Sequence, residues 1–257
     1  MLALLAAALF GISTPLVQKF GVGLGAFSTA ALLYAGAAAV GLLSRQRIER
    51  EARLQLNDMP RLLAMAGFGA VVGPVALAWG LQHTSGTSAS LMLTLEALFT
   101  AVLAWRLYRE TMDGRVWTAM ALLLAGGMVL VLDQGRTGGA QLWGLLAVLL
   151  ATAAWGVDNT LSRALAERDP GQVVMVKALL GATATALLAM LFGEPLPSAG
   201  AALALLAIGA TGYGRAFAFT CWRSARSAQR ARDRCLPLRP SSAPRLRWPW
   251  ATAQPAA

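Results

Sequence analysis

Three ionisable residues lie within otherwise apolar stretches of the sequence, namely Glu96, Asp158 and Lys177. Charged groups are costly inside a membrane, so each is a candidate functional group. Glu96 lies at the centre of its stretch, where its carboxyl group could bind a cation or a proton, or act as a hydrogen-bonded structural group. Lys177 could pair with Asp158 across two helices, which would neutralise both charges. Otherwise Asp158 is interfacial, and the Lys177 side chain extends to the membrane surface.

Polar uncharged residues accompany these charges in the apolar stretches. Ser13 and Thr14 precede Pro15, which frees a backbone carbonyl group. Their hydroxyl groups can satisfy that carbonyl, so they are structural or form a polar notch that faces a pathway. Tyr34 lies in the middle of its stretch and could line a cavity. We therefore predict a substrate pathway lined by Glu96, Asp158, Asn159, Lys177, Ser13, Thr14 and Tyr34.

The sequence holds no recognised catalytic or metal-binding motif. The P-loop, H-E-x-x-H, G-x-S-x-G and C-x-x-C patterns are all missing, and His83 is the single histidine. We therefore expect no catalytic residues, no metal site, no cofactor and no enzymatic activity. An intramembrane enzyme would instead require Glu96 and Asp158 to meet at one site.

The stretches that carry these residues have the length of membrane-spanning helices. Apolar residues make up 57% of the 257 residues and charged residues 13%, whereas soluble domains have roughly 45–50% and about 25%. A helix needs about 20 mostly apolar residues to cross a bilayer. The sequence predicts an all-α transmembrane bundle with eight helices, at about 2–19, 27–43, 61–82, 86–105, 115–132, 141–161, 172–191 and 198–214.

Basic residues alternate between the two sets of connections. Ten lie in the loops 44–61, 106–115 and 162–171, whereas the other connections carry only Lys19 and Arg136. Loops rich in Lys and Arg stay in the cytoplasm. We therefore expect a protein of the inner membrane with its N-terminus and its C-terminal tail in the cytoplasm.

The net charge of +10 comes mostly from the tail, residues 215–257, which hold nine arginines and one aspartate. Nucleic acid is therefore not an expected partner of the helical part. For the tail itself three interpretations stay open: a frameshifted or mispredicted C-terminus, a disordered segment that binds anionic lipid, or a segment that binds nucleic acid. A frameshift predicts that another reading frame encodes two further apolar helices.

Two segments of the sequence resemble each other. Phe10-Gly-Ile-Ser-Thr-Pro-Leu16 matches Trp155-Gly-Val-Asp-Asn-Thr-Leu161, and Gly69-Ala70 is echoed by Gly209-Ala210. One copy contains five helices, so the second starts from the opposite side of the membrane and the repeat is inverted. The predicted organisation is a first repeat (1–132), a linker (133–140), a second repeat of three helices (141–214) and a basic tail (215–257).

With these motifs the chain resembles EamA-type transporters of the drug/metabolite transporter superfamily. Further similar segments are Ser90–Thr100, Arg109-Glu110, Gly126-Gly127 and Asp169-Pro170 with Lys177. The resemblance covers residues 1–214. It implies ten helices in two five-helix repeats, and movement of a small metabolite without ATP hydrolysis. It also implies that helices 1, 3, 4, 6 and 8 line the pathway.

The predicted function is therefore secondary transport of a small metabolite by alternating access, with proton coupling through Glu96 as one option. The partners are a small-molecule substrate and the lipid bilayer, and faces rich in small residues would permit a homodimer. The alternatives are a membrane scaffold without transport activity and an inactive, truncated transporter remnant. A scaffold predicts binding without flux.

Overall fold

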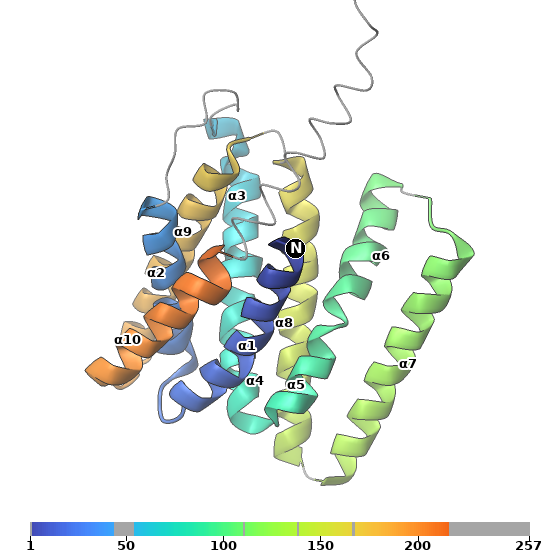
Figure 1. Cartoon of the computed structure of the whole chain (residues 1–257), viewed down its shortest axis with the longest axis horizontal. Helices are drawn as coiled ribbons and strands as arrows, with labels where there is room; N and C mark the ends of the chain where they lie inside the picture. The colour runs from blue at the N-terminus through green and yellow to red at the C-terminus, as the bar shows by residue number, and fades with distance from the viewer. Residues whose placement is uncertain (1, 44–53, 110, 138, 166–167, 216–257) are drawn as a thin grey trace, which may run out of the picture.

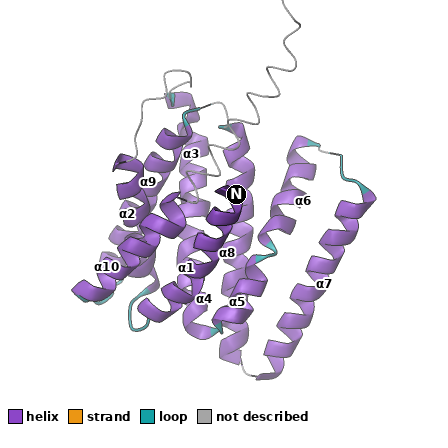
Figure 2. Cartoon of the chain, in the orientation of Figure 1, coloured by secondary structure: helices purple, strands orange, loops and turns teal. Residues whose placement is uncertain are grey.

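The computed structural model describes residues 2–43, 54–109, 111–137, 139–165 and 168–215. All elements in these ranges are helical and none is a strand, as Figure 2 shows. The predicted all-α bundle is therefore confirmed. The first half of the chain forms α1 (Leu2–Phe20), α2 (Ala26–Leu43), η1 (Leu56–Asp58), α3 (Met59–Ala66), η2 (Gly67–Val72), α4 (Gly73–His83), α5 (Gly86–Leu93), α6 (Glu96–Tyr108) and α7 (Gly114–Thr137). The second half forms α8 (Gly139–Ala164), α9 (Pro170–Leu191), α10 (Ala199–Ile208) and η3 (Gly209–Arg215).

The elements join into eight helical segments at the predicted positions, and six of them are long and apolar enough to cross a membrane. The six are Ala26–Leu43, Leu56–His83, Gly86–Tyr108, Gly114–Asp133, Gln141–Ala164 and Gly171–Leu191. Ala199–Gly212 forms a shorter apolar helix. Large apolar side chains stay exposed on the outside of the bundle, for example Leu122, Val129 and Leu187. Such a surface suits lipid rather than water.

Two of the spans are interrupted. Between α5 and α6 the chain makes a tight turn at Thr94 and Leu95, whose amides donate to the carbonyls three residues earlier. The span from Leu56 to His83 widens into the π-helix η2, whose Gly69 carbonyl accepts hydrogen bonds from two other helices. Interruptions at this depth persist only where protein groups satisfy the freed backbone.

The most extensive helix packing in the bundle is the interface of α2 with α9, here called the seam; the two helices lie side by side in Figure 1. A Cβ atom at Gly36 in α2 would overlap the Leu206 carbonyl, and one at Gly181 in α9 would overlap Ala70. Glycine is therefore needed at both positions for close helix approach. The spacing in sequence from Gly36 to Gly181 equals that from Phe10 to Trp155.

The two ends of the bundle differ in charge. At the upper end in Figure 1, α2, α6 and α8 finish, and α3, α7 and α9 start. We call this end the basic end, because arginines gather where its helices finish or start: Arg61, Arg106, Arg115, Arg163 and Arg168. The other end is called the opposite end, and there α9 finishes and α2 starts.

Close packing of α2 against α10 makes a specific prediction. Gly36→Ala should lower the thermal unfolding midpoint in detergent, because overpacking a filled core costs about 1–3 kcal/mol. Gly11→Ala is the matched control, since a Cβ atom there meets nothing within 4 Å. Equal stability of the two variants in a thermal unfolding assay would contradict the close approach at Gly36.

Candidate functional site

A buried ion pair joins α8 to α9 near the centre of the molecule. Lys177 Nζ donates a hydrogen bond to Asp158 Oδ2, and the two residues are only 5% and 1% exposed. The pairing that the sequence left open is therefore present in the structure. A buried charge needs such a partner, because removing an ion from water is costly.

Gly69 of η2 makes room for this ion pair. A Cβ atom at Gly69 would overlap the Asp158 carboxylate. The Gly69 carbonyl is held by two hydrogen bonds, from Tyr34 Oη (2.5 Å) and from Trp155 Nε1 (3.0 Å). Tyr34 and Trp155 thus fix the widened backbone against which Asp158 rests. The backbone at this contact, that of η2, comes from the first half of the chain. The two charged side chains, Asp158 and Lys177, come from the second half.

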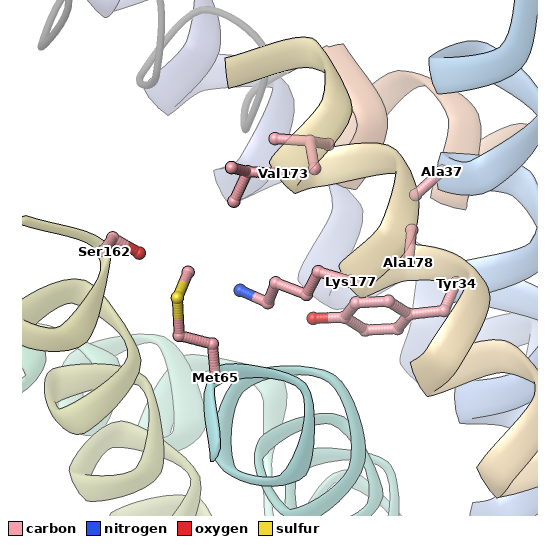
Figure 3. A pocket seen from close by; sticks show the side chains of 8 residues that line it. Tyr34, Ala37, Met65, Ser162, Val173, Lys177 and Ala178 are labelled. Atoms are coloured by element: carbon pink, nitrogen blue, oxygen red, sulfur yellow. The ribbon is translucent and has the colours of Figure 1, made fainter. Parts of the chain in front are cut away.

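Lys177 and Tyr34 lie side by side and point in the same direction into a small cavity, which Figure 3 shows from close by. Met65 and Ser162 lie on its other side. The cavity has a volume of about 20 Å³, which is room for one water molecule. Its lining residues are Tyr34, Ala37, Met65, Ser162, Val173, Val174, Lys177 and Ala178.

The Asp158 carboxylate retains a free acceptor. Its Oδ1 atom is buried and has no hydrogen-bond partner among the described residues. Buried polar atoms are nearly always hydrogen-bonded to protein, water or ligand. Oδ1 is therefore placed to accept a hydrogen bond from a small polar molecule that enters the bundle.

Glu96 and Asn159 form a second polar contact on another side of α8. Asn159 Nδ2 donates to Glu96 Oε1 at 2.6 Å and lies 3.4 Å from Thr100 Oγ1. Glu96 is the first residue of α6, directly after the interruption of the span. The sequence predicted Glu96 at the centre of a continuous helix, so the break was not foreseen.

This second contact lines a cleft of about 680 Å³ between α6, α7 and α8. The cleft has the size of a small-molecule site. Its polar lining includes Thr94, Glu96, Thr100, Asn159 and Arg163. Asp158 and Asn159 are adjacent in sequence, so their side chains leave α8 about 100° apart. The helix α8 thus contributes a residue to each polar contact: Asp158 faces Lys177 of α9, and Asn159 faces Glu96 of α6.

Five of the seven predicted pathway residues gather around α8, either directly or through Gly69: Glu96, Asp158, Asn159, Lys177 and Tyr34. Ser13 and Thr14 are buried in α1. Sequence reasoning missed the parts played by Gly69 and Trp155, which entered only as residues of the repeat. Among the described residues no group of three His, Cys, Asp or Glu side chains could hold a metal ion.

Comparison with known proteins places the chain in a family. Residues 1–132, just over half of the chain, match the EamA-like transporter family. The chain belongs to the EamA-like transporter family. Its apolar spans and this membership make it a multi-pass membrane protein of a transporter family. The resemblance seen in the sequence motifs is confirmed.

One relative agrees with this assignment, and one solved structure shares the fold. An uncharacterized transporter of Methanothermobacter thermautotrophicus is 28% identical over 149 residues, which span 56% of this chain and 43% of that protein. The matched segment is thus less than half of the relative's length. A solved structure, described only as a crystal structure of a protein, has a TM-score of 0.65 at 23% identity. It covers 88% of this chain, which covers 78% of it, and this likeness concerns the fold alone.

The ion pair in this EamA-like chain predicts a clear pattern of stabilities. Asp158→Leu or Lys177→Met alone should lower the free energy of unfolding by about 3–5 kcal/mol, because each leaves one buried charge unpaired. The double variant should regain most of that loss, since it buries no charge. Asp113→Asn, a change at an exposed residue, is the control. Thermal unfolding in detergent measures all four, and single variants as stable as the control would contradict a buried ion pair.

Proposed function

We propose that this chain is a secondary transporter that moves a small metabolite by alternating access between two inverted repeats. The observation that carries the proposal is the Asp158–Lys177 pair, buried between α8 and α9 with an open acceptor on Oδ1. Charged pairs near the membrane midplane, beside interrupted helices, are typical of substrate sites in secondary transporters. Residues 1–132 are the proposed first repeat, 133–140 the linker and 141–214 the second repeat.

The packing supports two equivalent halves. Gly36 in α2 contacts the eighth helical segment at Leu206, and Gly181 in α9 contacts the third at Ala70. Both of these segments contain a π-helix, η2 in one and η3 in the other. Each seam helix therefore packs closely on the π-helical segment of the other half. Such matching interfaces suit two halves that rock about the seam.

We further propose that the basic end faces the cytoplasm of a cell whose inner membrane holds the protein. The arginines at that end support this, because basic loops are retained on the cytoplasmic side. Glu96 is the proposed proton carrier, since it is the carboxyl group in the cleft between α6, α7 and α8. A homodimer through faces rich in small residues is a further proposal.

A flux measurement tests the proposed function and identifies a substrate in the same step. Vesicles that contain the full chain are incubated in a cell metabolite extract, and the accumulated compounds are identified by mass spectrometry. At least one compound should accumulate saturably above protein-free vesicles. Its uptake should fall about tenfold or more in Gly69→Ala, which displaces the Asp158 carboxylate. Gly67→Ala should keep the flux, because a Cβ atom there meets nothing within 4 Å.

The failure of this assay has a defined meaning. If folded protein accumulates no compound from the extract, alternating-access transport by this chain is wrong. Equal flux in Gly69→Ala and Gly67→Ala would instead show that transport does not depend on the Asp158–Lys177 pair.

A second candidate function, a membrane scaffold or an inactive remnant, is favoured by one observation. Gly156 in α8 is covered by Phe99 of α6, whereas Gly11, which matches it in the repeat, meets no described residue. A face of α1 is thus uncovered by the described part of the chain. Under this second function the chain would bind a partner helix and show no flux, so the vesicle assay separates the two.

A further inference from the structure

Glu194 fastens the two halves together at the opposite end of the seam. It follows α9 and Gly193, whose φ of +63° turns the chain back. Glu194 Oε1 accepts from the Phe27 amide (3.1 Å), and Oε2 accepts from the Ser28 amide (2.6 Å). These amides belong to the first turn of α2, where no helix carbonyl is available to them. The carboxylate from one half therefore caps a helix of the other half.

The surroundings of Glu194 are shaped for this contact. A Cβ atom at Gly25 would overlap its carboxylate, so the glycine leaves the space that Glu194 fills. Phe192 and Phe27 stack beside it, with ring centroids 5.2 Å apart and an interplanar angle of 6°. The Glu194 carboxylate thus fills a space that Gly25 leaves open, beside the stacked rings of Phe27 and Phe192.

Asp58 and Arg168 make the corresponding contact at the basic end. Arg168 Nε lies 2.8 Å from Asp58 Oδ2, and Nη2 donates to Oδ1 at 3.2 Å. The side chains are only partly accessible, at 22% for Arg168 and 7% for Asp58. Beside them Gln172 of α9 accepts from the Leu54 amide at 3.0 Å. A bidentate ion pair of this kind holds its two side chains in one relative orientation.

The two contacts lie at opposite ends of the bundle, and each joins segments from the two halves. Asp58 follows α2 and holds the segment that starts α9, whereas Glu194 follows α9 and holds the segment that starts α2. Each carboxylate therefore ties the start of one seam helix to the chain that follows the other. Since α2 and α9 start at opposite ends of the bundle, each end has its own fastening.

We propose that Asp58–Arg168 and Glu194 are paired latches, one for each end of the seam, and that they open alternately during transport. This inference rests on the proposed alternating-access function. Both latches are closed in the structure, and the Lys177 cavity lies along the seam between them. Breaking one latch opens the seam at its own end and leaves the other end closed. Glu194, Asp58 and Arg168 thereby become gating residues, a role distinct from binding the metabolite.

Two buried positions report on the two ends. Thr29 in α2 lies just beyond the Glu194 latch, and Val174 in α9 lies just beyond the Asp58–Arg168 latch; both are buried. Their spacing in sequence is again that of Phe10 and Trp155. Each is replaced by cysteine in a full-length background in which Cys221 and Cys235 are changed to serine. The purified protein is then labelled in detergent with a water-soluble maleimide.

Glu194→Ala should speed labelling at Thr29→Cys by about tenfold and leave Val174→Cys unchanged. Asp58→Asn should do the reverse. Asp58→Arg combined with Arg168→Asp should return Val174→Cys to its slow rate, because the pair is restored with reversed charges. Asp113→Asn, an acidic residue whose side chain bonds within its own turn at the start of α7, should change neither rate.

Three results would overturn the latches: no change in either rate, faster labelling at both ends from one variant, or no rescue by the reversed pair. The second result would mean general loosening rather than gating. Labelling needs no substrate, so it separates this inference from the proposed function. Labelling rates that shift as expected in a protein without flux would support the latches and contradict transport. Flux without the expected shifts in labelling rate would support transport and contradict the latches.

Discussion

The rest of this structure depends on a single buried ion pair, between Asp158 and Lys177. Two charges inside an apolar bundle are tolerated only when each neutralises the other and the backbone around them is satisfied. The pair therefore fixes the spacing of α8 and α9. It also requires the cross-bundle hydrogen bonds of Tyr34 and Trp155, which hold the widened η2 backbone in place.

Small residues make that arrangement compatible with close packing. Gly69 leaves room for the carboxylate, and Gly36 and Gly181 let the seam helices approach the segments beside them. In lipid there is little hydrophobic drive between helices, so close contact and polar pairing must hold them together. The seam is thus tightly packed at its middle and fastened at its ends by Asp58–Arg168 and Glu194. A structure built in this way can rock about its centre while its ends open.

The sequence predicted the eight helical segments well, because apolar stretches of spanning length leave few alternatives. It also selected Asp158 and Lys177, since charges stand out in such stretches. It did not reveal the break before Glu96, because the residues around Thr94 and Leu95 carry no proline or glycine. It could not reveal the latches either, because nothing in the sequence distinguishes Glu194 and Asp58 from other charged residues in loops. Their partners are distant in sequence and come close only in the folded chain. Most of the tail that the sequence singled out, residues 216–257, lies outside the described residues.

The most direct test of the central claim is a pair of spin-label distances in the full chain, one across each end of the bundle. Labels at Val22 and Leu196, two exposed positions, report on the opposite end, and labels at Leu56 and Arg163 report on the basic end. If the halves rock about the Asp158–Lys177 pair, any condition that widens one distance should narrow the other or leave it short. Distances that widen together, or a single fixed distance at both ends under every condition, would contradict the account.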